Sequence, residues 1–87
     1  MALRKTVVFR GLAVPDAYVR IYNLSGKVSV GIFVSLHVTP EQDAFDTREY
    51  NFFPDHERPI MRQAYDFLKR QEEFEGAVDV MEAGEGD

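Results

Sequence analysis

The chain has 87 residues, of which 45% are hydrophobic and 29% are charged, and it contains no cysteine. This length fits a single domain with one core, and the composition excludes a disordered chain. The lack of cysteine excludes a disulfide framework and a cysteine-ligated zinc site, so apolar packing must stabilise the domain.

The net charge of −5 is concentrated toward the C-terminal end. Residues from Glu72 onward hold seven acids and no base, whereas residues 1–71 carry ten bases against eight acids. We interpret the acidity as a property of a solvated tail. The sequence therefore predicts a single α+β domain over residues 1–80 and a flexible acidic tail over residues 81–87.

Neither end of the chain contains a segment expected to enter a membrane. Arg4, Lys5 and Arg10 interrupt any apolar run near the N-terminus, so a signal peptide is not predicted. No stretch approaches the roughly 20 apolar residues that a membrane span requires. We therefore expect a cytoplasmic protein with no membrane partner.

The first half of the chain predicts three strands. The sequence RKTVVFRG predicts the first strand, and GLAVPD predicts a turn in which Pro15 and Asp16 end it. The second strand is expected over Ala17–Leu24 and the third over Lys27–Val38. In the third, every even position is apolar, which predicts a long strand with one buried face: Val28, Val30, Ile32, Val34, Leu36 and Val38.

Ser25 and Gly26 predict a two-residue hairpin turn between the second and third strands. Such a turn places Leu24 opposite Lys27 and sets the register of the whole hairpin. The predicted pairs are Ile21–Val30, Val19–Ile32 and Ala17–Val34 on the apolar face, and Tyr18–Phe33, Tyr22–Ser29 and Arg20–Gly31 on the other.

The second half of the chain predicts one more strand and a helix. TREYNFF predicts the fourth strand, and helical spacing begins after Pro59, which suits the first helical position. AVDV forms either a short closing strand or an extended packed segment. The predicted fold is an antiparallel four-stranded sheet (β-β-β-β-α) with one helix packed on one face. The helix is expected to bury the even-numbered residues Val28–Leu36 beneath Met61, Ala64, Tyr65 and Leu68.

The residues that could carry chemistry do not form a catalytic or metal-binding pattern. His37 on the polar face and His56 in a loop are expected to be exposed, because their spacing matches no metal motif. The acids of DAFDTRE lack the ligand density and the glycine of a calcium loop. No serine lies in a nucleophile elbow. We therefore predict a non-enzymatic protein with no metal, cofactor or small-molecule substrate.

One face of the predicted hairpin is unusually aromatic for a solvent-exposed surface. It carries Tyr18, Arg20, Tyr22, Leu24 and Phe33, and tyrosine and arginine are residue types that anchor protein interfaces. The predicted interface residues are Tyr18, Arg20, Tyr22 and Phe33. Two interpretations remain open: this face binds a protein partner, or the sheet curls so that the first strand or the C-terminal segment covers the rings. Nucleic-acid binding is disfavoured, because Arg20 is the only cation amid the cluster and Lys27 lies at its edge.

Two segments, VPDAYVRI (14–21) and QAYDFLKRQEEFEGAVDV (63–80), together resemble a family of small uncharacterised proteins. Tailed bacteriophages and prophages encode this family, often in the tail and baseplate gene region. This chain departs from the family at RQEEF, where a threonine-leucine-proline-containing stretch is commoner, and in its acidic tail. The family supplies no catalytic or binding residues.

The resemblance implies a phage structural or assembly protein, located in the host cytoplasm or in the virion. Its partners would be further copies of itself or other phage proteins. The alternative is a small intracellular regulatory or binding module that acts on host protein or nucleic acid.

Overall fold

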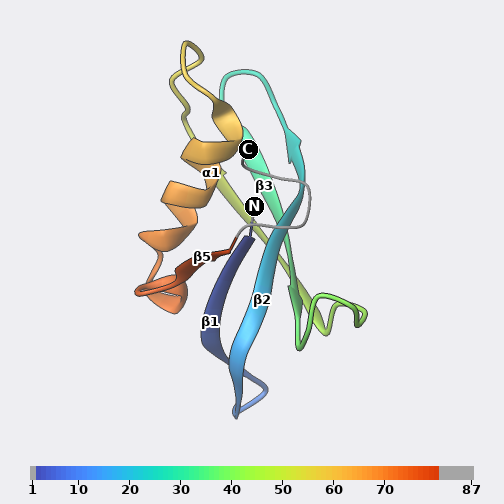
Figure 1. The fold of residues 1–87 in the computed structure, drawn as a ribbon. Helices are drawn as coiled ribbons and strands as arrows, with labels where there is room; N and C mark the ends of the chain where they lie inside the picture. Colours follow the sequence, from blue (N-terminus) through green and yellow to red (C-terminus); the bar gives the residue numbers. More distant parts are fainter. Residues whose placement is uncertain (1, 81–87) are drawn as a thin grey trace.

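The fold is a five-stranded antiparallel sheet with one α-helix on one of its faces (Figure 1). The computed structural model describes residues 2–80, and the predicted acidic tail at 81–87 lies outside them. In space the strands follow the order β4-β3-β2-β1-β5. The elements are β1 (Ala2–Phe9), β2 (Leu12–Ser25), β3 (Val30–His37), β4 (Asp46–Phe52), α1 (Ile60–Lys69), the 3₁₀ turn η1 (Glu72–Phe74) and β5 (Val78–Val80).

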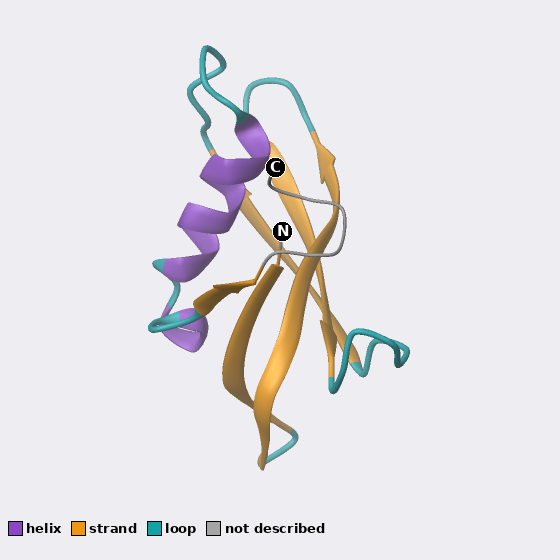
Figure 2. Ribbon diagram, viewed as in Figure 1, coloured by secondary structure: helices purple, strands orange, loops and turns teal. Residues whose placement is uncertain are grey.

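The predicted α+β class and the single α-helix are confirmed. The segment AVDV supplies a fifth strand, because β5 pairs antiparallel with β1. Figure 2 shows the helix against one side of the sheet. Within the described residues, no helix is long and apolar enough to cross a membrane.

The predicted turn at GLAVPD is wrong, because Pro15 and Asp16 lie inside β2. The true turn is Arg10–Gly11, with φ of 52° and 80°, as a tight two-residue hairpin turn requires. Proline and aspartate instead mark an irregularity: the pairing shifts between Lys5 and Val7, and Asp16 has φ of 48°. A bulge accommodates a proline that cannot donate to the strand ladder.

The predicted register of the β2–β3 hairpin is also wrong. Ile21 pairs with Val34 rather than Val30, and the loop contains four residues, 26–29. Gly26 has φ of 123°, and a Cβ there would lie 2.1 Å from the Ser29 carbonyl oxygen, so the loop needs glycine at this point. Up to Ile21 the displacement is four residues, an even number that leaves these side chains on their predicted faces. Beyond the bulge it is five residues, so Leu24 pairs with Ile32 and packs against the core, and its predicted place on the aromatic face is wrong.

The core lies between α1 and the sheet face that β2 and β3 present to it. The apolar stripe of β3 is buried from Val30 to Leu36, and α1 contributes Ala64, Tyr65 and Leu68. The prediction is wrong at its end: Val28 lies in the loop and is 79% exposed, and Met61 is 44% exposed. The stripe of β3 is thus shorter than its sequence pattern, and Ile60 rather than Met61 packs against the core in the first turn of the helix.

Tyr65 connects the helix to the sheet by a polar contact inside the core. Its hydroxyl accepts a hydrogen bond of 3.0 Å from the backbone N–H of Ile21. A β-bulge begins at Ile21, where the pairing passes from Ile21–Val34 to Asn23–Phe33. Bulges interrupt the ladder of backbone hydrogen bonds, so the tyrosine satisfies a donor that the irregularity displaces.

Candidate interaction surface

The predicted interface residues lie on the outer face, which we define as the face of the sheet opposite α1. Side chains alternate along a strand, so Tyr18 and Arg20 point away from the core that holds Val19 and Ile21. The outer face is therefore where the sequence predicts it. The contacts between its side chains differ from the predicted ones, because the β2–β3 register differs from the predicted register.

The bulge brings Tyr22 and Phe33 together on the outer face. The pairing steps from Ile21 to Asn23, so Tyr22 is the additional residue opposite Phe33. The two ring centroids are 6.3 Å apart at an interplanar angle of 53°. Tyr22 is 56% exposed and Phe33 is half-buried, so this aromatic pair presents surface to a partner.

Tyr18 lies apart from this pair, because it is opposite His37 rather than Phe33. Its ring meets the imidazole edge at 6.1 Å, and the Arg4 guanidinium lies 5.8 Å from its centroid. Tyr18 is only 4% exposed. The four predicted residues thus divide into a buried ring, Tyr18, a half-buried ring, Phe33, and two exposed side chains, Arg20 and Tyr22.

His37 organises the outer face and is half-buried, so the prediction of an exposed histidine is wrong. Its Nδ1 donates to the Gln42 carbonyl oxygen at 2.8 Å, since a carbonyl can only accept. Its Nε2 lies 2.9 Å from Ser35 Oγ, which in turn is 3.4 Å from the Arg20 carbonyl oxygen. This chain of contacts ties the loop after β3 to the sheet.

The Ser35–His37 distance is that of a nucleophile and its base, but the setting differs from a catalytic one. Both residues lie on β3, two positions apart, and side chains at such positions share one face of the sheet. Their proximity therefore needs no catalytic explanation. Ser35 is buried within the sheet rather than displayed on a strained turn. We therefore infer that the Ser35–His37 contact stabilises the fold.

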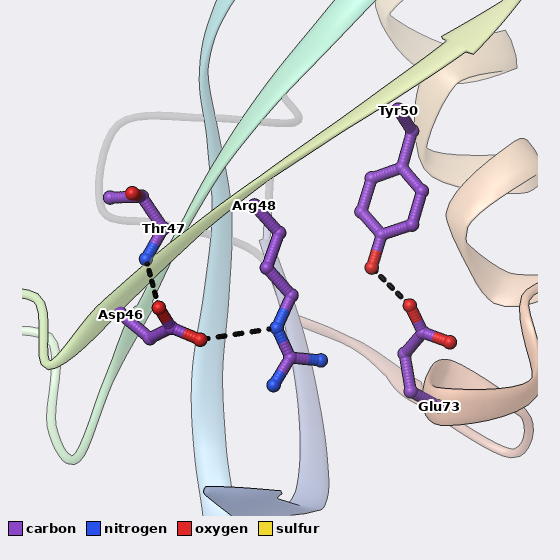
Figure 3. A network of polar contacts seen from close by, with 5 residues as sticks. All are labelled: Asp46, Thr47, Arg48, Tyr50 and Glu73. Carbon is purple, nitrogen blue, oxygen red and sulfur yellow. Dashed lines mark hydrogen bonds and ion pairs between the residues drawn. The ribbon is translucent and has the colours of Figure 1, made fainter.

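A second polar cluster lies on the inner side, between β4 and η1 (Figure 3). Tyr50 donates its hydroxyl proton to the Glu73 carboxylate, and Arg48 pairs with Asp46 at 3.3 Å. Burial, followed by the Glu73 contact, raises the pKa of Tyr50 to about 12. The hydrogen bond from Tyr50 lowers the pKa of Glu73. At neutral pH the pair is a phenol bound to a carboxylate, which fastens η1 to the sheet.

A small cavity lies where β4 ends beside α1. It has a volume of about 170 Å³ and is lined by Phe52, Phe53, Arg58, Gln63, Asp66 and Arg70. Neither this cavity nor the Tyr50–Glu73 contact is apparent from the sequence, because each joins residues that are distant along the chain. Among residues 2–80, no group of three or more His, Asp or Glu side chains could hold a metal ion.

No family model, no curated protein and no solved structure matches this chain.

Proposed function

We propose that this protein is a non-enzymatic structural or assembly component that acts through protein–protein contacts of its outer face. The observation that carries the proposal is the Tyr22–Phe33 pair, in which an exposed tyrosine and a half-buried phenylalanine lie on the same sheet face as the exposed Arg20. Tyrosine and arginine are enriched among residues that dominate binding energy. Adjacent apolar side chains that form a patch with a polar rim favour a binding role.

The arrangement of the pair suits an interface. The bulge holds Tyr22 against Phe33 before any partner arrives, so less side-chain entropy is lost on binding. Each ring can bury on the order of 150–250 Å² when covered. Glu49, opposite Phe33 on β4, adds a polar rim next to the rings. Its negative charge also disfavours nucleic acid at this face.

The phage or prophage role rests on the resemblance of segments 14–21 and 63–80. In the fold, these two segments support each other: Tyr65, from the second, accepts the hydrogen bond of Ile21, from the first. Phe74, from the second segment, is buried in the core. Both segments thus contribute residues to the core, which supports a common fold, and the tail or assembly role is proposed from the resemblance alone. Action on a host protein is the second candidate.

The partner that we propose first is a second copy of this chain. The test is Tyr22→Glu, with molar mass measured by light scattering over a concentration series. We expect the wild type to associate and the variant to have a dissociation constant raised by about tenfold or more, since loss of an aromatic anchor costs roughly 2 kcal/mol.

Leu12→Glu is the control, because Leu12 is also a large hydrophobic residue exposed at the surface but lies next to the β1–β2 turn. Circular dichroism should show all three proteins folded. A wild type that remains monomeric at every concentration would refute self-association. An equal loss with Leu12→Glu would refute the assignment to the outer face.

A further inference from the structure

The cavity between β4 and α1 has a rigid frame. Gln63 on α1 accepts a hydrogen bond from the Asp55 backbone N–H at 2.8 Å through Oε1. Its Nε2 donates to the carbonyl oxygens of Asp55 and Arg58 at 2.8 and 3.1 Å. One amide side chain therefore fixes both ends of the turn that carries Arg58. The cavity is positioned by the helix rather than by a free loop.

The charges around the cavity are unbalanced. Arg58 and Arg70 line it, and within residues 2–80 neither guanidinium forms an ion pair or a side-chain hydrogen bond. Asp66 is the one acid in the lining, and its carboxylate lies 3.7 Å from Lys69 Nζ. A negatively charged group of another molecule would therefore balance the positive charge of the two arginines.

The size of the cavity limits what can enter it. About 170 Å³ is less than the roughly 300–1,000 Å³ of sites that hold cofactors or drug-sized ligands. It accommodates one side chain. Phe52 forms a buried part of the wall, while Phe53 stands 79% exposed at the rim, where it offers an apolar surface to whatever carries that side chain.

We propose that this cavity binds the carboxylate of an aspartate or glutamate presented by a protein partner. Arg58 and Arg70 would hold the carboxylate, because guanidinium groups match its planar geometry with paired hydrogen bonds. Phe53 would pack against apolar residues beside the acid. The cavity and the Tyr22–Phe33 pair lie on different elements, α1 and β4 against β2 and β3, so this contact is independent of the proposed outer-face interface.

The test is a nuclear magnetic resonance titration that follows the Nε–H signals of the two arginines. The probe is a capped hexapeptide, Gly-Leu-Glu-Glu-Leu-Gly, and its comparison peptide has glutamine at both glutamate positions. We expect the glutamate peptide alone to shift the Arg58 and Arg70 signals at constant ionic strength. Arg58→Gln and Arg70→Gln should each weaken its binding by about tenfold, as loss of one charge-assisted contact implies.

Arg62→Gln is the control, since Arg62 lies exposed on α1 outside the cavity lining. Equal shifts with the glutamine peptide, or equal weakening by Arg62→Gln, would overturn the proposal. Sodium acetate that binds as tightly as the peptide would assign the cavity to small free anions and also overturn it. Tyr22→Glu should leave peptide binding unchanged, so failure of this proposal is distinguishable from failure of the outer-face interface.

Discussion

The two faces of the sheet are organised by different rules. On the inner face, burial follows the alternation of apolar residues, and Ile32 and Val34 are fully covered. On the outer face, the arrangement depends on details of pairing: the bulge at Tyr22 creates one ring pair, and the register places Tyr18 beside His37. A register displaced by an even number of residues keeps the same apolar side chains on the inner face, so the core there is preserved. On the outer face any displacement changes the contacts, because each contact joins specific residues on paired strands.

A large effect is expected when Ile32 on the inner face is truncated, and it is compared with truncation of Tyr22 on the outer face. Ile32→Ala should lower the free energy of unfolding by roughly 2–5 kcal/mol, because it leaves a cavity in a fully buried site. Tyr22→Ala, on the outer face, should cost clearly less in the isolated domain. Urea denaturation measures both. A loss below about 0.5 kcal/mol for Ile32→Ala would show that β3 does not form the core.

The next effect tests the bond that joins the helix to the bulge. Tyr65→Phe removes the hydroxyl that accepts the Ile21 N–H and leaves a buried donor without that acceptor. The expected cost is about 1–3 kcal/mol in the free energy of unfolding. Tyr22→Phe is the control, since its ring is largely exposed and should change stability little. Equal stability of both variants would show that the hydroxyl does not support the bulge.

Much of the fold is predictable from the sequence, because local signals agree with the tertiary arrangement. The alternation in β3, the helical spacing at Ala64, Tyr65 and Leu68, and the strand TREYNFF all predict elements that the structure contains, although β3 begins at Val30 rather than Lys27. The errors fall at proline and glycine. Pro15 signals a bulge as well as a turn, and Gly26 permits loops of two residues or four. Sequence spacing alone cannot choose between these outcomes.

The candidate surface is predictable only as a face. Alternation assigns Tyr22 and Phe33 to the same side of the sheet. Their contact requires a bulge, and no residue near it in β2 predicts one. The cavity is not predictable for a different reason: its lining includes both Arg58 and Arg70 because Gln63 on α1 anchors the turn that carries Arg58. Such contacts between distant residues are set by packing rather than by local pattern.

A smaller effect concerns the rim of the inner face, where Tyr50 binds Glu73. The pKa of Tyr50 is raised from 10.0 to about 12, so the unfolded chain releases this proton before the folded chain does. The contribution of Tyr50 to stability is thus complete below pH 10 and is lost as pH rises toward 12. The pKa of Glu73 is lowered, so its contribution is lost as pH falls below 4.5.

The experiment compares thermal unfolding of the wild type and Tyr50→Phe across this alkaline range. The difference in melting temperature between the two proteins should shrink from pH 10 to pH 12. Because Tyr50 is partly exposed, the change should be modest. A difference that stays constant with pH would mean that Tyr50 ionises equally in the folded and unfolded chains.

The smallest predicted effect is that of Val28→Asp, and its comparison with Val30→Asp tests the register of the β2–β3 hairpin. Val28→Asp should change the free energy of unfolding by no more than about 0.5 kcal/mol, because Val28 lies exposed in the loop at 26–29. Val30→Asp should unfold the domain, because an unpaired charge would enter the core. A two-residue turn at Ser25–Gly26 would instead pair Val28 with Asn23 and place it on the inner face with Val30. In that register both aspartates would be strongly destabilising, so urea denaturation of the two variants distinguishes the registers.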